Sequence, residues 1–147
     1  MIKLVVVGKM NHKYLNQGVE YYKKQVPQKL EIIEIKDGKN EQAVNDEGMA
    51  ILKHIGQNDY VISLAINGKT YSSESFSKHL ENMMMHQHHD IIFVIGGSYG
   101  LSKEVYDRTN ERLSFSKMTF PHQLMRLIFV EQLYRAFMIM KHHPYHK

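Results

Sequence analysis

The chain has 147 residues and a mass of 17.3 kDa, the size of one domain, here expected to span residues 1–147. With 43% hydrophobic and 23% charged residues and 0 Cys, its composition excludes a disordered chain, a disulfide scaffold and a thiolate site. The formal net charge is +4, and no apolar run approaches the roughly 18 residues that a membrane span needs.

The N-terminal third alternates between strand and helix patterns. Residues 2–7 are a Val-rich apolar run that predicts a buried strand. This run is too short for a signal peptide and lacks a cleavage pattern, so we expect a cytoplasmic protein. Apolar residues at helical spacing predict a helix over residues 14–25, which Pro27 ends. Alternation predicts a strand over residues 30–35, and residues 41–55 have a weak helical pattern.

The middle of the chain repeats this alternation. Residues 60–66 predict a strand that ends at an Asn-Gly turn beginning at Asn67. Residues 72–85 predict a helix whose N-terminus Ser72 caps. Residues 91–95 are wholly apolar and predict another buried strand.

The last third ends in a long helix. Residues 102–107 predict a short helix and residues 113–115 a short strand. Thr119 is expected to cap a helix that starts near Pro121 and runs to about Lys141. Because strands read as continuous apolar runs and alternate with helices, we predict an α/β fold, with a mainly parallel sheet and helices on both faces.

Basic charge is concentrated at the C-terminal end. All the arginines lie between Arg108 and Lys147, where Glu111 and Glu131 are the only acids. Such a basic segment on a nearly neutral body indicates a polyanion such as nucleic acid as partner. A solvated basic tail is the alternative.

A glycine-rich loop follows the strand at residues 91–95, in the sequence FVIGGSYGLS. Glycines at the carboxyl end of a buried strand let the backbone approach a ligand closely. The loop matches neither a P-loop nor the Gly-x-Gly-x-x-Gly fingerprint, which disfavours ATP-type and dinucleotide sites. A tight turn without a ligand is the alternative.

The long helix is apolar nearly all round. Its one ion pair in register joins Glu131 to Arg135. Since one face can pack on the sheet, we expect another to pack on a second subunit in a two-fold homodimer. A central core helix in a monomer is the alternative.

Several histidines gather at two places in the sequence, but no acidic or Cys partners accompany them. We therefore expect no metal site. The histidines considered as ligands are His86, His88, His89, His142 and His146.

Two blocks, residues 91–101 and residues 113–147, closely resemble the RlmH family of bacterial SPOUT methyltransferases. The resemblance implies S-adenosylmethionine as cofactor and methylation of N3 of a pseudouridine in helix 69 of 23S ribosomal RNA. It also implies a homodimer and a C-terminal trefoil knot, a feature that pattern reasoning alone does not reach.

The resemblance also implies a cofactor site in the knot, built by three segments. These are the end of the third strand, the glycine loop and the loop before the long helix. Backbone groups and apolar side chains there suit adenine. The implied residues are Leu64, Gly96, Gly97, Gly100, Phe115, Ser116, Lys117, Met118, Thr119 and Phe120.

Two features depart from the family pattern. Residues 36–48 are shorter than in family members, which we expect to truncate the second helix. Tyr99 replaces a smaller, acidic or amide residue, which we expect to crowd the cofactor loop.

Methylation of a ring N3 requires that the weakly acidic N3–H lose its proton, so a base or an anion-stabilising donor is needed. Candidates for this catalytic role are His122, Tyr145 and His146, with Arg126 holding phosphate or the developing anion. Tyr145 and His146 are favoured because a packed core explains no such tail.

Two other function classes remain open from the residues. A flavodoxin-like nucleotide enzyme would need a Ser/Thr-rich loop after the first strand, and Gly8-Lys9-Met10-Asn11 is a poor one. A non-catalytic RNA- or ribosome-binding module would share the basic tail but need no cofactor pocket.

Overall fold

The computed structural model describes residues 1–87 and 89–147. Three predicted strands are found at their predicted bounds, and the remaining elements differ by a few residues. In chain order the elements are β1 (Ile2–Val7), α1 (Lys13–Gln25), β2 (Leu30–Ile35), the short 3-10 helix η1 (Glu41–Ala43), α2 (Val44–Leu52), β3 (Tyr60–Thr70), α3 (Ser73–His86), β4 (Ile91–Ile95), α4 (Lys103–Arg108), β5 (Glu111–Ser114) and α5 (His122–Met140).

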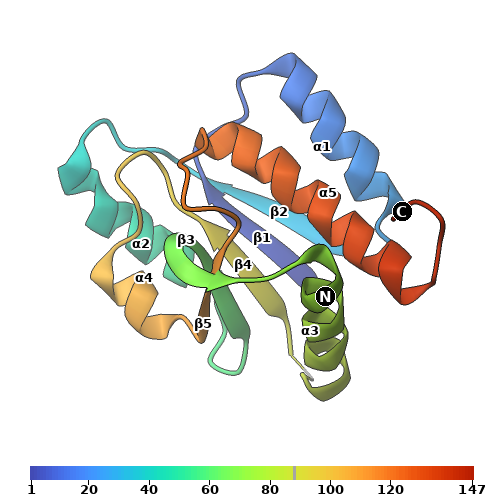
Figure 1. Ribbon diagram of the computed structural model, residues 1–147. Helices are drawn as coiled ribbons and strands as arrows, with labels where there is room; N and C mark the ends of the chain where they lie inside the picture. The colour runs from blue at the N-terminus through green and yellow to red at the C-terminus, as the bar shows by residue number, and fades with distance from the viewer. Residues whose placement is uncertain (88) are drawn as a thin grey trace.

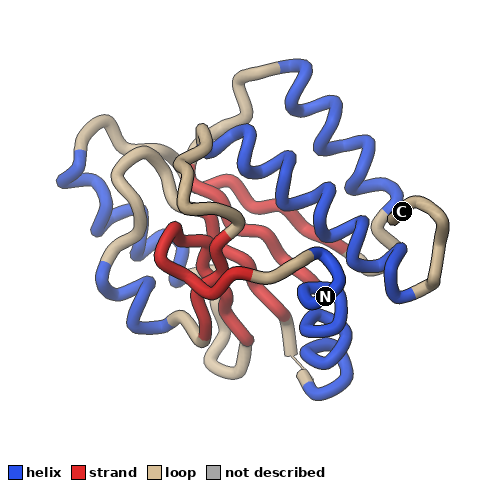
Figure 2. The backbone as a smooth tube through the Cα atoms, viewed as in Figure 1, coloured by secondary structure: helices blue, strands red, loops and turns tan. Residues whose placement is uncertain are grey.

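The strands form one parallel sheet in the order β2-β1-β4-β3-β5. Helices cover both of its faces, which confirms the predicted α/β class (Figures 1 and 2). On one face α5 packs between α1 and α3, and on the other α2 packs with α4. The carboxyl ends of all five strands therefore meet at one edge of the sheet.

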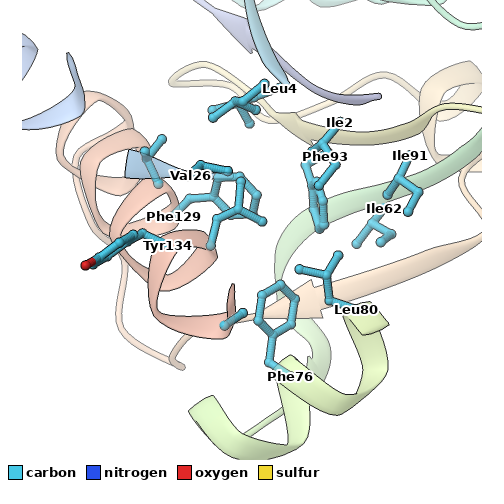
Figure 3. Packing of buried hydrophobic residues seen from close by; sticks show 14 of the residues in the cluster. Ile2, Leu4, Val26, Ile62, Phe76, Leu80, Ile91, Phe93, Phe129 and Tyr134 are labelled. Carbon is cyan, nitrogen blue, oxygen red and sulfur yellow. The ribbon is translucent and has the colours of Figure 1, made fainter. Parts of the chain in front are cut away.

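The sheet is buried because its strands are apolar on both faces. Every residue of β4 is buried, and Phe93 contacts Phe129 of α5 with ring centroids 4.6 Å apart. Figure 3 shows Phe93 between Phe129 and the α3 residues Phe76 and Leu80. A separate apolar cluster, which includes Val94 and Val105, fills the space under α2 and α4.

Hydroxyl side chains start two of the helices. Ser72 accepts the amide of Ser75 at 3.0 Å and Ser102 accepts that of Val105 at 3.3 Å, as expected of N-caps. The expectation for Thr119 is wrong. Helix α5 begins two residues later, after Pro121, with no side-chain cap, because Pro fixes a backbone angle suited to helix entry.

Strand β3 does not end at Asn67. It continues to Thr70, but its pairing with β5 shifts so that both Leu64 and Lys69 are opposite Leu113. Residues 65–68 therefore leave the ladder, and we call them the β3 excursion. A Cβ on Gly68 would lie only 2.7 Å from the carbonyl carbon of Arg112, so glycine lets the two strands close again.

Substituting Gly68 with alanine is expected to lower the free energy of unfolding by about 1–3 kcal/mol, the cost of overpacking against β5 backbone. Urea denaturation measures the change. The neighbouring exposed residue supplies the control, since Asn67→Ala is expected to stay within about 0.5 kcal/mol. Equal stabilities of the two variants would contradict the close approach at Gly68.

Helix α2 covers 9 residues, fewer than the 15 of the predicted 41–55 segment, because η1 takes up its beginning. No helix in residues 1–87 or 89–147 is long and apolar enough to cross a bilayer. The trefoil knot stays a prediction at this point.

Candidate functional site

A pocket of about 420 Å³ opens at the carboxyl edge of the sheet. Its walls are the β3 excursion, the glycine loop after β4 and residues 115–120 before α5. In Figure 1 these three segments, coloured green, yellow-orange and orange, lie near one another at the carboxyl ends of β3 and β4. The volume lies in the range of small-molecule and cofactor sites.

The structure brings together nine of the ten residues implied as cofactor contacts. Lys117 is the exception, since it is exposed and does not line the pocket. Neighbours of these segments complete the wall. The lining residues among the expected set are Leu64, Gly96, Gly97, Gly100, Phe115, Ser116, Met118, Thr119 and Phe120, and those not expected include Ala65, Ile66, Asn67, Leu101, Tyr106 and Met125.

The unexpected wall residues Ala65, Ile66 and Asn67 belong to the β3 excursion. The Asn67-Gly68 pair at the end of the excursion predicts a turn that ends the strand. A strand that leaves its ladder for four residues and then resumes has the same local sequence pattern, so the excursion could not be told from a turn. The sequence cue is the apolar Ile66 directly before the Asn67-Gly68 pair; in the structure its side chain is 52% exposed and lines the pocket.

The glycine loop is a tight turn that its glycines permit. The amide of Gly100 donates to the carbonyl of Gly97 at 3.1 Å, and Gly100 has a positive φ of 80°. A Cβ on Gly96 would lie 3.0 Å from the Gly100 backbone, and one on Gly97 would lie 3.0 Å from Val7 Cγ1. The loop therefore presents bare backbone to the pocket.

Tyr99 does not crowd this loop, contrary to expectation. Its side chain is 54% exposed and is not part of the pocket wall. The turn between Gly97 and Gly100 places the residue at its tip outward.

Residues 115–120 are held by local hydrogen bonds. The Ser114 hydroxyl donates to the Ser116 carbonyl at 3.1 Å, and Ser116 Oγ accepts the amide of Met118 at 2.9 Å. Phe115 packs edge-on against Phe129 of α5. Met118 remains 74% exposed at the pocket mouth, which leaves an apolar side chain free to cover a ligand.

His122 occupies the wall between this pocket and a second one. It lines both, and the second pocket lies at the carboxyl ends of β1 and β2 with Gly8 and Asp37 in its wall. Of the four residues predicted to be catalytic, His122 is therefore the one that the fold of a single chain places at this pocket.

Arg126 lies beneath the second pocket and does not face a free anion. Its side chain is buried, with Nη1 donating to Glu34 Oε2 at 2.8 Å and Nη2 to the Gly8 carbonyl at 3.0 Å. Burial lowers the pKa of Arg126, and the Glu34 carboxylate opposes that shift. The expected contact with phosphate is replaced by these internal partners, which fix the loop after β1.

Substituting Arg126 with methionine is expected to lower the free energy of unfolding by about 2 kcal/mol, because Glu34 and the Gly8 carbonyl lose a buried donor. Lys103→Met is the matched control. Its pair with Asp107 is exposed on both sides, so removal is expected to change stability by less than about 0.5 kcal/mol. Urea denaturation of both variants makes the comparison, and an unchanged midpoint for Arg126→Met would contradict the structural role.

The C-terminal tail, residues 141–147, folds back on the end of α5. The Tyr145 hydroxyl donates to Glu131 Oε2 at 2.7 Å, and its ring packs against Tyr134. His146 contacts Arg135 Nη1 at 3.0 Å through Nδ1 and Glu74 Oε1 at 2.6 Å through Nε2.

The tail thus has hydrogen-bond partners within its own chain, a feature that the sequence did not predict. The predicted pair of Arg135 with Glu131 is present at 2.9 Å, and its hydrogen bond with Glu131 raises the pKa of Arg135. Burial, with hydrogen bonds to Tyr22 and Glu131, raises the pKa of Tyr145. Tyr145 therefore stays a neutral donor at physiological pH.

The tail lies against the C-terminal half of α5, and the pocket lies at the start of the helix. The tail reaches back along α5 as far as Glu131, which is a rise of about 14 Å from the first helical residue. In this chain Tyr145 and His146 do not line the pocket.

Among the described residues no group of three His, Cys, Asp or Glu side chains could hold a metal ion. His88, one of the histidines considered above, lies outside the described residues.

Comparison with known proteins assigns the family. A family model described as predicted SPOUT methyltransferase matches residues 1–146. The chain belongs to the SPOUT methyltransferase family. Curated relatives of this SPOUT methyltransferase include a protein from Enterococcus faecalis at 50% identity and one from Streptococcus thermophilus at 48%. Each alignment covers 99% of both chains, and both relatives are named ribosomal RNA large subunit methyltransferase H.

Each of those alignments spans 157 positions, more than the 147 residues of the chain. The relatives therefore carry residues without a counterpart in this SPOUT methyltransferase, and the expected position of the shortening, at residues 36–48, stays a prediction. Among solved structures, a probable methylase family protein from Haemophilus influenzae matches with a TM-score of 0.54 at 12% identity. The match covers 96% of this chain and 66% of that one, and it supports the fold.

Proposed function

We propose that this SPOUT methyltransferase uses S-adenosylmethionine to methylate N3 of a pseudouridine in helix 69 of 23S ribosomal RNA. One observation carries the cofactor assignment: three segments far apart in the sequence, singled out by their resemblance to a methyltransferase family, line one pocket. The names of the relatives, at up to 50% identity over 99% of both chains, support the ribosomal RNA substrate. A ribosome-modifying enzyme is expected in the cytoplasm.

The pocket suits the proposed cofactor chemically. Apolar side chains of Leu64, Met118 and Phe120 can enclose an adenine ring, and the bare backbone at Gly96 and Gly97 can follow a bent ligand. When bound, the cofactor supplies an electrophilic methyl group on a sulfonium. The protein then contributes position and exclusion of water. The C-terminal trefoil knot implied by the resemblance would hold these segments rigidly together.

We further propose a homodimer in which each chain completes the site of the other. The outward side of α5 is half-buried and carries Leu124 and Ile128, a surface that a second copy would cover. Because Tyr145 and His146 pack against the C-terminal half of α5 and do not line their own pocket, we assign them to the pocket of the partner. The basic residues of the C-terminal segment would hold RNA phosphates beside it.

The experiment that tests the function has two measurements. Calorimetry with S-adenosylhomocysteine tests the pocket, and mass spectrometry of ribosomal RNA from a strain that lacks the gene and is complemented with this chain tests the target. Binding together with restored N3-methylpseudouridine is the expected result. Absence of cofactor binding would favour the alternative, a non-catalytic RNA- or ribosome-binding module, and sedimentation at twice the chain mass tests the dimer.

A further inference from the structure

The second pocket, at the carboxyl ends of β1 and β2, has no role in the function proposed so far. It has a volume of about 590 Å³, in the range of sites that hold small molecules and nucleotides. Its wall includes Lys9, Lys36, Asp37, His122 and Gln123. Two cations, a carboxylate and an imidazole offer partners to the phosphate and to the ring of a nucleotide.

This pocket adjoins the cofactor pocket. In the described part of the chain two pockets share lining residues with it. One, which shares Leu113 and Phe115, has a volume of only about 30 Å³ and cannot hold a base. The other is the second pocket, which shares His122. A methyl acceptor must meet the cofactor from an adjoining space, and of these two pockets the second has the size to hold a base.

Gly8 and Gly97 lie at the boundary between the pockets; Asp37 lies close to both glycines, and His122 lies close to Gly8. A Cβ on Gly8 would lie 3.4 Å from His122 Nε2 and 3.8 Å from Asp37 Oδ2. A Cβ on Gly97 would lie 3.5 Å from Asp37 Oδ1. Gly8 has a positive φ of 103°, so this backbone favours glycine. A carboxylate and an imidazole therefore converge on one point at the cofactor side of the pocket.

The start of α5 adds donors at the same place. The first hydrogen bond of the helix runs from the Met125 amide to the Pro121 carbonyl, so the amides of His122 and Gln123 belong to its open end. Helix N-termini favour negative charge, and a uracil-type ring that has lost its N3 proton is an anion. Gln123 itself is fixed, because its Oε1 accepts the Asn11 amide at 2.9 Å.

We propose that the second pocket receives the target base, with the imide edge of the ring against His122 and the start of α5, and with Asp37 accepting a ring N–H. This inference rests on the proposed function and extends it to the recognition of the base. Pseudouridine differs from uridine by a second ring N–H, at N1. A carboxylate that accepts this N–H distinguishes the two bases, because uridine would leave the acceptor unpaired.

His122 then accepts the N3 proton. The N3–H bond breaks, its electron pair remains on the ring as an imide anion, and the proton moves to Nε2 of the neutral imidazole. The helix N-terminus stabilises that anion. Asp37 is a specificity residue, whereas His122 is a catalytic residue in direct contact with the reacting base.

The direct test is binding of pseudouridine 5′-monophosphate in the presence of S-adenosylhomocysteine, followed by NMR of histidine-labelled protein. We expect the nucleotide to shift the imidazole signals of His122 and to leave those of exposed His54 unchanged. Asp37→Asn should reduce the affinity for pseudouridine monophosphate roughly 10-fold, to that for uridine monophosphate, since a hydrogen bond to a charged acceptor is lost. Asp46→Asn, which removes an exposed carboxylate on α2, is the matched control.

The same variants are then assayed on ribosomes. We expect His122→Gln to lower kcat roughly 100-fold or more with unchanged S-adenosylhomocysteine affinity, and His54→Gln to have no effect. Asp37→Asn should lower the preference for pseudouridine over uridine. A nucleotide that leaves His122 unshifted, or an Asp37→Asn protein that behaves like Asp46→Asn, would overturn the pocket assignment. A wild-type protein that methylates no ribosomal RNA would instead refute the proposed function.

Discussion

Replacing Gly97 with valine is expected to weaken S-adenosylhomocysteine binding by roughly 100-fold or more while the chain stays folded. The added side chain would meet Val7 Cγ1 at 3.0 Å from its Cβ alone, and its two methyl groups must then displace either Val7 or the ligand. Titration calorimetry measures the affinity, and circular dichroism checks the fold. Cofactor affinity equal to the wild type in a folded Gly97→Val protein would remove the glycine loop from the site.

A second variant separates the two effects of the added side chain. Val7→Ala gives the valine of Gly97→Val room in the core, so the double variant should regain stability but not affinity.

Ala65→Trp tests the opposite wall, because Ala65 lies in the β3 excursion on the far side of the same pocket. It is expected to reduce affinity similarly, as the indole fills space that the ligand needs. Together these variants test the site from both sides.

Deleting residues 144–147 is expected to reduce methyl transfer roughly 5- to 150-fold, the loss of an aromatic stacking contact worth about 1–3 kcal/mol. Cofactor binding should persist, because the tail does not line the pocket of its own chain. Some stability should also be lost, since Tyr145 packs on Tyr134 and donates to Glu131. Activity is measured on ribosomes and stability by thermal melting.

Mixing variants tests whether the tail acts on the partner. A tail-deleted chain retains a working pocket, and a Gly97→Val chain retains a working tail. If the tail of each chain serves the other, their heterodimer regains one of its two sites. If heterodimers form but remain inactive, each chain completes its own site, and the tail must then leave Glu131 and Glu74 to reach it.

The sequence predicts the layers of the fold because the strands are short apolar runs with clear ends. β1, β2 and β4 are found at their predicted bounds. The glycine loop could also be predicted from the sequence, since glycines after a buried strand imply that the backbone approaches a ligand closely. By contrast, the residues before α5 joined the site only through their resemblance to a known family. A loop that mixes polar and apolar residues has no periodicity, so its sequence does not predict which parts of the chain it contacts.

Other features depend on contacts that no local pattern encodes. The β3 excursion arises from a register shift against β5, and Arg126 finds its partners in Glu34 and Gly8, 92 and 118 residues away. From the sequence alone, a basic residue on a helix is as compatible with a phosphate contact as with a buried ion pair. The tail is a similar case, because its aromatic and histidine side chains pack on α5 and α3 after the chain has turned back.

Helix α5 holds in place a loop that precedes it by more than 100 residues. The Gln123 side chain accepts the Asn11 amide across 112 residues, and Arg126 donates to the Gly8 carbonyl across 118. Until α5 has been synthesised and has folded, the loop after β1 lacks these anchors, and the second pocket, which Gly8 and Asn11 line, lacks a fixed wall. The second pocket therefore forms late during synthesis, and a chain truncated before His122 is expected to lack it.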